Sequence, residues 1–312
     1  MGSPRLSILI PTLDAEADLA RLLPALRAQS LWGESEMLVV DSDSSDCTRQ
    51  ILRREGIEVT RIEKSQFRHG ATRNLLASQA RGELCVFLTQ DALPDGPEFL
   101  AELVRPLEDP RVAGSTARVL PHEGDDALTA RTVLDAPEAS EEAWVRELNG
   151  AGQGWPASAD QRVELLRFNN VASCIRRSML AEIPFPDVAF GEDLAWAARA
   201  LTRGWRIAFA PHAVVRHAHR YGPAQAFERY RIDAAFHRRV HGHRIRPSLA
   251  SVVRGFVYEV RADLRFVGAR RRGFHQLLRS PALRGAQVLG QYFGSRGWSL
   301  GLRGRHATSE LV

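Results

Sequence analysis

The sequence predicts an α/β fold in which a mostly parallel β-sheet is flanked by helices and followed by a basic helical C-terminal appendage. Three observations lead to this prediction. Short strand-like and helix-like segments alternate through the first 120 residues, the run 84–88 is apolar at every position, and the chain beyond Pro223 is amphipathic and helical. Uninterrupted apolar strands are typical of parallel sheets buried on both faces, and strand–helix alternation favours such sheets.

The first half of the expected sheet can be followed element by element. Strands are predicted at 7–10, 37–40, 58–62 and 84–88, and helices at 15–29, 46–54 and 70–80. The first of these helices carries its apolar residues at the spacing of one helix face, namely Leu19, Leu22, Leu23 and Leu26. We therefore expect helices to connect the strands and to cover both faces of the sheet.

The strand–helix pattern lapses between Pro121 and Gln161. This stretch is acidic and rich in Ala, Gly and Pro, with one amphipathic piece at 129–148, and such segments often form lids or acceptor sites. Order returns at 168–172. A helix is expected to begin at Glu192 and Asp193 and to end at Gly204, and strand pieces are expected at 206–209 and 213–216.

The charge of the chain is unevenly distributed. From residue 201 onward there are 21 arginines and five acids, a net charge of +16, whereas the first 200 residues carry a net charge of −11. This asymmetry suggests an anionic partner, such as a phosphate-bearing ligand or membrane headgroups. The basic helices either lie on an anionic membrane surface or pack on the body with their arginines in solvent, and the sequence leaves both alternatives open.

Composition excludes several classes of protein. With 44% hydrophobic and 25% charged residues, the chain is neither wholly disordered nor fibrous. No apolar stretch reaches the roughly 18 residues of a membrane span, and the short run 7–10 is too brief for a signal peptide. The three cysteines suggest neither a disulfide framework nor a zinc knuckle. We therefore expect a cytoplasmic protein.

Carboxylates stand where the expected strands end. Asp41 follows the strand 37–40 and Asp91 follows the strand 84–88, and ligands of open α/β sheets bind at this carboxyl edge. The chain has neither a dinucleotide fingerprint after the first strand nor a P-loop. Two acids at adjacent strand ends, joined by Arg73 from the intervening helix, favour a nucleoside-diphosphate site over two unrelated turn residues.

Five short motifs carry a resemblance to a known family. They are SILIPT at 7–12, VVDSDSSD at 39–46, FRHGATRN at 67–74, FLTQDA at 87–92 and GED at 191–193. Each is weak alone, but the ordered set, which spans residues 5–240, resembles family 2 glycosyltransferases of the GT-A fold. The runs 69–74 and 88–94 are similar to the rhamnosyltransferase branch in particular.

The resemblance implies roles for individual residues. Pro11, Thr12, Asp14 and Asp41 match positions around the nucleotide, with Asp41 accepting the imino proton of thymine or uracil, and Arg73, Thr89 and Gln90 match further donor contacts. Asp91 matches the last carboxylate of the family's metal motif, which binds Mg²⁺ or Mn²⁺ beneath the donor pyrophosphate. His217 or His219 matches a position near that metal, and Asp193 matches the catalytic base, with Glu192 as its fallback.

The resemblance also implies a reaction. A metal-dependent, inverting glycosyltransferase (a hexosyltransferase) would move a sugar, with dTDP-rhamnose as the favoured donor, to a hydroxyl of a glycan or lipid-linked saccharide. Thr89 stands where the family's first metal-binding Asp would be, which leaves Asp91 as the only acid of that motif. Because Asp193 stands at a helix start, the helix dipole is expected to hold its pKa low.

The domain organisation follows from the same comparison. We expect a catalytic domain over residues 1–222, with its nucleotide-sugar half at about 1–120 and its acceptor half at about 121–222. The basic amphipathic helices occupy residues 223–312. The location is cytoplasmic, with attachment to the inner face of the cell membrane if the basic helices bind lipid.

Competing interpretations remain. The same fold could use a UDP-hexose or UDP-hexosamine donor, or the chain could be a non-catalytic binding protein whose basic C-terminus holds nucleic acid or membrane. Nucleic acid is not an expected partner, since the sequence has no aromatic–basic platform.

His237, His241 and His243 lie in a uniformly basic stretch, which favours a solvated basic face over a metal site. Trp144 and Trp155 could stack on sugar rings or fill the core.

Overall fold

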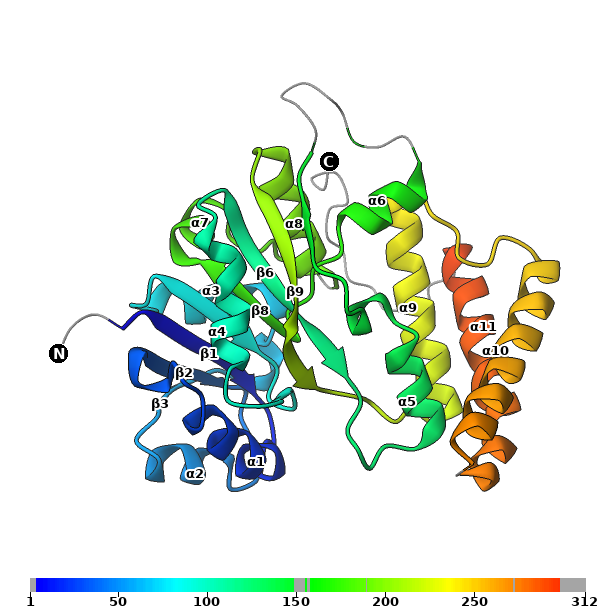
Figure 1. Ribbon diagram of the computed structural model, residues 1–312, viewed down its shortest axis with the longest axis horizontal. Coiled ribbons are helices and arrows are strands. Elements are labelled where there is room, and N and C mark those ends of the chain that lie inside the picture. The colour runs from blue at the N-terminus through cyan, green and yellow to red at the C-terminus, as the bar shows by residue number, and fades with distance from the viewer. Residues whose placement is uncertain (1–3, 149–154, 156–157, 189, 272, 298–312) are drawn as a thin grey trace.

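The computed structural model describes residues 4–148, 155, 158–188, 190–271 and 273–297. Within these residues nine strands form one sheet in the order β3-β2-β1-β4-β8-β6-β9-β5, with β7 paired to β9 (Figure 1). The strands are β1 (Leu6–Thr12), β2 (Ser35–Asp41), β3 (Glu58–Arg61), β4 (Leu84–Leu88), β5 (Leu93–Pro94), β6 (Val112–Leu120), β7 (Trp144–Arg146), β8 (Ala172–Arg176) and β9 (Arg206–Arg216).

The sheet is mixed but mostly parallel in its first half. β1 pairs in parallel with β2 and β4, and β2 pairs in parallel with β3. β8 lies antiparallel between β4 and β6, and the short strands β5 and β7 are antiparallel to β9. Because β1 separates β2 from β4, the prediction that Asp41 and Asp91 follow adjacent strands is wrong, although both lie at the same edge.

Helices cover both faces of the sheet. α1 (Glu16–Arg27), α2 (Thr48–Arg54) and α4 (Phe99–Val104) cover one face, whereas α3 (His69–Gln79), α7 (Arg177–Glu182) and α8 (Glu192–Thr202) cover the other. In β1 the residues alternate between the two cores, with Ile8 and Ile10 facing α1 and Leu9 facing α3. This two-sided burial explains why the parallel strands read as uninterrupted apolar runs.

The segment without a clear pattern does contain structure. It forms α5 (Ala127–Leu134), β7 and α6 (Ala159–Leu165), while residues 149–154 and 156–157 lie outside the described part. The predicted piece at 129–148 is therefore a short helix followed by a strand. The chain from Phe168 to Val171 is irregular, and the strand begins only at Ala172.

One strand replaces the two that were predicted around Pro211. β9 runs unbroken through this proline because its pairing with β6 shifts register between Ala117 and Arg118, opposite Ala210 and Val214. Proline cannot donate a ladder hydrogen bond, and a bulge removes that requirement. Pro211, which suggested a break between two strands, therefore lies at a bulge inside one continuous strand.

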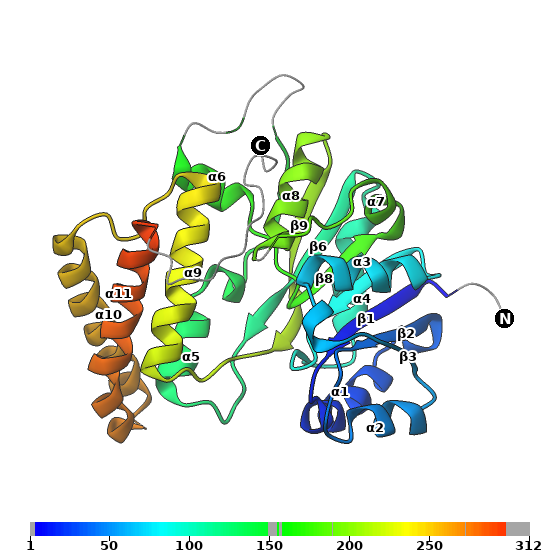
Figure 2. The same ribbon diagram turned by 180° about the vertical axis from the view of Figure 1, so that it is seen from behind.

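Three long helices form the C-terminal region. They are α9 (Pro223–His241), α10 (Leu249–Arg270) and α11 (Ser280–Ser295), with a 3₁₀ turn at Phe274–Arg279 before α11. α11 lies against α9, and both views place α10 outside this pair (Figures 1 and 2). Gly290 and Gly294 let α11 approach α9 closely, since a Cβ atom there would lie 2.3 Å and 2.2 Å from the carbonyl oxygens of Phe227 and Arg231.

A buried ion-pair network joins these helices to the rest of the molecule. Asp263 of α10 is fully buried and accepts hydrogen bonds from Arg131 Nε of α5 (2.5 Å) and from Arg284 Nε of α11 (2.9 Å). Arg131 also pairs with Glu259. The inner side of the C-terminal helices thus packs on the body. No described helix combines the length and the apolarity that crossing a bilayer requires.

Candidate active site

Asp91, His217 and His219 form one cluster at the carboxyl edge of the sheet. The strand register explains how they meet, because Leu93 of β5 pairs with Arg216 of β9. Asp91 stands two residues before Leu93, and His217 and His219 follow Arg216, so the pairing brings these side chains together. Nε2 of His217 lies 3.3 Å and Nε2 of His219 lies 3.8 Å from Asp91 Oδ2. The predicted metal residues are therefore brought together.

The donor set of this cluster suits a divalent cation. One ligand atom from each residue lies within 4.8 Å of the other two, and among the described residues this is the only His, Cys and acidic group with such spacing. Burial alone would raise the pKa of Asp91, but the hydrogen bond and charge of His217 hold it well below its usual range. A carboxylate that stays ionised, with two imidazoles, fits Mn²⁺ or Mg²⁺ together with oxygen ligands from a diphosphate.

Arg73 is paired with Glu192. Its Nη1 donates to Glu192 Oε1 at 2.8 Å, and both side chains are buried. Asn170 Nδ2 donates to the same carboxylate oxygen at 3.4 Å. Arg73 therefore fixes the acidic pair at the start of α8 instead of linking Asp41 to Asp91, and Glu192 stands in a buried ion pair.

Asp193 lies beside this pair with no cation of its own among the described residues. Its Oδ2 accepts a hydrogen bond from the backbone N–H of Asn170 (3.1 Å), and its Oδ1 accepts one from the N–H of Leu194 (2.8 Å). Burial, followed by the negative charge of Glu192, raises the pKa of Asp193 to about 7. The prediction of a low pKa is wrong, because desolvation and like charge outweigh the helix start.

A single loop connects the two acidic centres. The carbonyl of Val171 accepts a hydrogen bond from Thr89 N–H (3.0 Å), two residues before Asp91, while the N–H of Asn170 binds Asp193. This loop precedes β8, which pairs with β4, and so it lies at the carboxyl edge of β4. Asp91 and Asp193 thus lie at the same edge of the sheet.

The predicted nucleotide residues lie at the ends of β1 and β2. Asp41 is fully buried, and its carboxylate accepts hydrogen bonds from Thr12 Oγ1 (3.2 Å) and from the N–H of Ser44 (3.1 Å). Pro11 is partly exposed at the end of β1. Contact between Asp41 and a base would require these neighbours to move.

Asp14 closes the loop that follows β1. This exposed residue adopts a positive φ of 48°, and its carboxylate accepts hydrogen bonds from the N–H (2.7 Å) and the hydroxyl (3.0 Å) of Ser45. These bonds lower the pKa of Asp14. The loops after β1 and β2 are therefore held together before any ligand binds.

Gln90 and Thr89 have different environments. The amide of Gln90 accepts from Leu13 N–H (2.8 Å) and donates to Leu13 O (3.1 Å) and to Asp18 (3.0 Å), so it clamps the β1–α1 loop. The hydroxyl of Thr89 is buried beside Asp91, and its hydrogen bond helps to lower the pKa of that carboxylate. Thr89 therefore belongs to the surroundings of Asp91, whereas Gln90 belongs to the β1–α1 loop.

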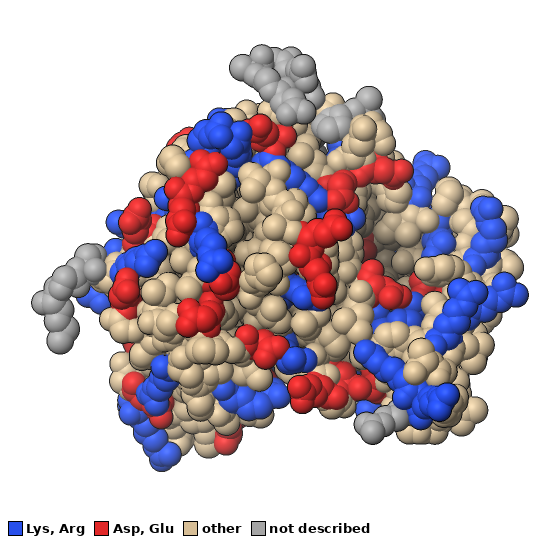
Figure 3. Space-filling view, viewed as in Figure 1, with Lys and Arg blue, Asp and Glu red and all other residues tan. Residues whose placement is uncertain are grey.

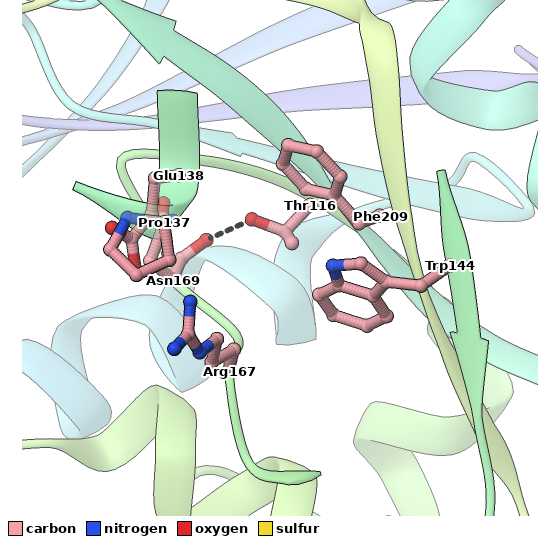
Figure 4. Close-up of a pocket in the computed structure, with 7 residues that line it drawn as sticks. All are labelled: Thr116, Pro137, Glu138, Trp144, Arg167, Asn169 and Phe209. Carbon is pink, nitrogen blue, oxygen red and sulfur yellow. Dashed lines mark hydrogen bonds between the residues drawn. The ribbon is translucent and has the colours of Figure 1, made fainter. Parts of the chain in front are cut away.

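A shallow pocket of about 220 Å³, which includes space open to solvent, lies next to the loop 169–171 (Figure 4). Its lining contains neither Asp91 nor Asp193, but Asn169 lies in that loop and its carbonyl accepts a hydrogen bond from Thr116 (3.1 Å). Trp144 stacks on Phe209 and carries the guanidinium of Arg146. Trp155 packs against the same core as Trp144, so both tryptophans have packing roles.

The C-terminal histidines are not a solvated face. His241 is buried, and burial lowers its pKa to about 4. His243 pairs with Asp160 at 2.9 Å, and His237 is only partly exposed. The prediction of a solvated face is therefore wrong for His241, because α9 packs this side against α6.

Sequence reasoning missed Asn170. This buried residue donates to Glu192 with its side chain and to Asp193 with its backbone, and its Oδ1 accepts from Ser173 (2.8 Å). The sequence feature that could have identified Asn170 was the polar pair Asn169–Asn170 inside an otherwise apolar segment. Ser44, which binds Asp41, was also missed.

Known proteins resemble this chain in sequence and in fold. The model of the glycosyl transferase family 2 matches residues 7–156. The O-antigen chain rhamnosyltransferase WbaN of Salmonella anatum is 31% identical over 75% of this chain and 72% of that protein, and RfbN of Salmonella typhimurium is 29% identical over the same shares. The mannosyltransferase PcManGT of Pyrobaculum calidifontis, solved with GDP-Man and Mn²⁺, is 19% identical with a TM-score of 0.57, covering 93% of this chain and 86% of that one.

The sheet topology and the solved mannosyltransferase structure place the chain in the GT-A class of folds. Within that class the chain belongs to glycosyl transferase family 2 and has O-antigen chain rhamnosyltransferases among its relatives.

Proposed function

We propose that this chain is an inverting rhamnosyltransferase that moves L-rhamnose from dTDP-rhamnose, with Mg²⁺ or Mn²⁺, to a hydroxyl of a glycan or lipid-linked saccharide. The observation that carries the proposal is the loop 169–171, which joins the cluster of Asp91, His217 and His219 to the carboxylate of Asp193, a group with no ion pair among the described residues. The two Salmonella relatives support the sugar, since both are named rhamnosyltransferases.

The donor diphosphate would lie over Asp91, His217 and His219. A divalent cation held there would stabilise the negative charge that develops on the departing diphosphate. Asp91 is suited to this role because His217, with Thr89 and His219, outweighs burial and holds the pKa of its carboxylate below the usual range. The hydroxyl of Thr89, which lies beside Asp91, would contact the same phosphates or a water molecule bound to them.

Asp193 is proposed as the catalytic base. It is a stronger base than an ordinary carboxylate, because burial and Glu192 raise its pKa towards neutrality. Glu192 is less suited, since its carboxylate is held in a buried ion pair with Arg73. We therefore assign Glu192, Arg73 and Asn170 to positioning Asp193. A single base that activates the acceptor hydroxyl for in-line attack gives inversion at the anomeric carbon.

The nucleotide would lie over the ends of β1 and β2, near Pro11, Thr12, Asp14 and Asp41. In this proposal Asp41 reads the base after Thr12 and Ser44 have moved, and Gln90 shapes the site by holding the β1–α1 loop. The acceptor would approach over the segment 121–165, beside the pocket at Asn169 and Trp144. We place the enzyme in the cytoplasm, on the inner face of the cell membrane.

The test is transfer and donor hydrolysis with a panel of nucleotide sugars, with and without Mn²⁺. Asp91→Asn and Asp193→Asn are each expected to lower kcat by about 10²–10⁴. Glu83→Gln, an exposed acid before the opposite end of β4, serves as the control and should keep wild-type activity. Full activity of both Asn variants contradicts the mechanism. Stronger competition by UDP than by dTDP contradicts the donor and favours a UDP-sugar.

A further inference from the structure

The outer face of α10 exposes an apolar stripe. Leu249, Val253, Val257 and Leu264 follow one another at helical spacing and each has between 38% and 66% of its surface exposed. Phe274 and Leu278, in the turn that follows α10, are also exposed. Large apolar residues gathered on one surface mark an interaction site more often than scattered ones do.

Arginines flank this stripe, and no acid of the described part of α10 lies beside it. The two acids of α10, Glu259 and Asp263, point inward, where they pair with Arg131 and Arg284. No acid follows Asp263 until Glu310. The exposed cations are Arg254, Arg261, Arg265, Arg270 and Arg271, and none of them pairs with an acid in the part of the chain that the structure describes, which excludes Arg272. Figure 3 shows basic residues gathered along the right-hand edge of the molecule, where α10 lies in the same view of Figure 1.

We propose that the outer face of α10 docks on an anionic lipid bilayer. The inference deepens the proposed location at the membrane, on which it rests, by assigning the surface that makes the contact. The apolar stripe would enter the headgroup boundary while the arginines beside it pair with lipid phosphates. The inward ion pairs keep α10 on the body, so the helix can present this face without leaving its site.

A bilayer explains both features of the face. A nucleic acid would account for the arginines but not for the exposed leucine and valine side chains. A second copy of the chain would bring the same positive charge against itself. A bilayer of anionic lipids matches the apolar residues and the charge together. Because α5 is tied to α10 through Arg131, docking would also bring the acceptor segment close to the membrane that holds a lipid-linked saccharide.

The experiment is sedimentation of the full chain with vesicles of phosphatidylcholine alone and of phosphatidylcholine with phosphatidylglycerol, at about 0.15 M salt. Strong binding to the mixed vesicles and weak binding to the neutral ones is expected. The double variant Arg254→Gln with Arg261→Gln should lower the partition coefficient about 25-fold, since each arginine near an anionic surface contributes roughly fivefold. Val253→Ser with Leu264→Ser should lower it about tenfold or more.

A charge-matched control is available on α2. Arg53→Gln with Arg54→Gln removes two exposed charges from another helix and should bind vesicles as the wild type does. The proposal is overturned if both arginine pairs act alike, if neutral vesicles bind as well as anionic ones, if duplex DNA is bound more tightly than lipid, or if the serine pair instead dissolves a dimer seen by light scattering. Binding of dTDP should be unchanged in every variant, so a failure here is distinct from a failure of the proposed activity.

Discussion

Phe236 of α9 packs directly against Gly191, the residue that precedes the acidic pair Glu192–Asp193. Gly191 has a φ of +81°, and a Cβ atom at this position would lie 2.3 Å from Cε2 of Phe236. The C-terminal region therefore contacts the backbone from which the proposed base projects. A motif that reads as a local sequence feature is in fact positioned by a helix more than 40 residues further along the chain.

Replacing Gly191 with alanine is expected to impair both stability and activity. A left-handed backbone costs an L-residue roughly 1–2 kcal/mol, and the clash with Phe236 would displace either α9 or the start of α8. We expect kcat to fall about 10- to 100-fold, as a shift of about 1 Å in a catalytic group can cause. Steady-state kinetics and urea unfolding would measure the two effects.

Gly204 provides the matched control for this change. It has a φ of +84° and open space around its missing side chain. Gly204→Ala should lose a similar amount of backbone stability and keep its kcat. Equal kcat values for the two alanine variants would show that the contact with Phe236 has no influence on the base.

Activity should rise with pH through neutrality. The base must be ionised to accept a proton, and the pKa of Asp193 lies at about 7. The ionised fraction of Asp193 therefore increases as the pH rises through that value, and kcat/KM increases with it. Below that value activity is lost. A pH–rate profile that is flat between about pH 6 and 8 would contradict this assignment.

Glu192→Gln tests the cause of the raised pKa. Burial is the largest cause and remains, but the neighbouring negative charge is removed, so the pKa of Asp193 should fall. The acidic limb of the profile should then move to lower pH, with a lower kcat because the partner of Arg73 is lost. A role limited to packing would reduce activity without moving the limb.

The cation cluster can be tested by binding alone. His217→Ala removes one expected ligand and a hydrogen-bond partner that lowers the pKa of Asp91, so we expect Mn²⁺ in the presence of dTDP to bind about 10- to 100-fold more weakly. His212→Ala, an exposed histidine within β9, should leave the affinity unchanged. Isothermal titration calorimetry would compare them, and equal affinities would remove His217 from the site.

The sequence predicted those parts of the fold and site that depend on local patterns. The apolar runs identified β1, β2 and β4, and the motif at Glu192–Asp193 identified the start of α8. The pairing of Arg73 with Glu192, the role of Asn170 and the raised pKa of Asp193 were missed. Each of these depends on residues that are distant in sequence and meet only in the folded chain, where burial decides the electrostatics.

Asp263 is expected to be the most sensitive residue of the C-terminal helices. It is fully buried and balances two arginines from α5 and α11, so removing its charge would leave the buried guanidinium of Arg284 without an acidic partner among the described residues. Breaking a buried pair costs about 3–5 kcal/mol, and we expect Asp263→Asn to reduce the free energy of unfolding by this amount.

Asp233→Asn is the control, because Asp233 pairs with Arg229 at 3.9 Å on a more exposed surface and should cost about 1 kcal/mol or less. Since burial raises and the arginines and Ser280 lower the pKa of Asp263, with a net lowering, its stabilising effect should be present near neutral pH and lost as the pH falls through the lowered value. Urea unfolding of both variants at neutral and acidic pH measures this, and equal losses of stability would mean that α5 is not held to α10 and α11 by this network.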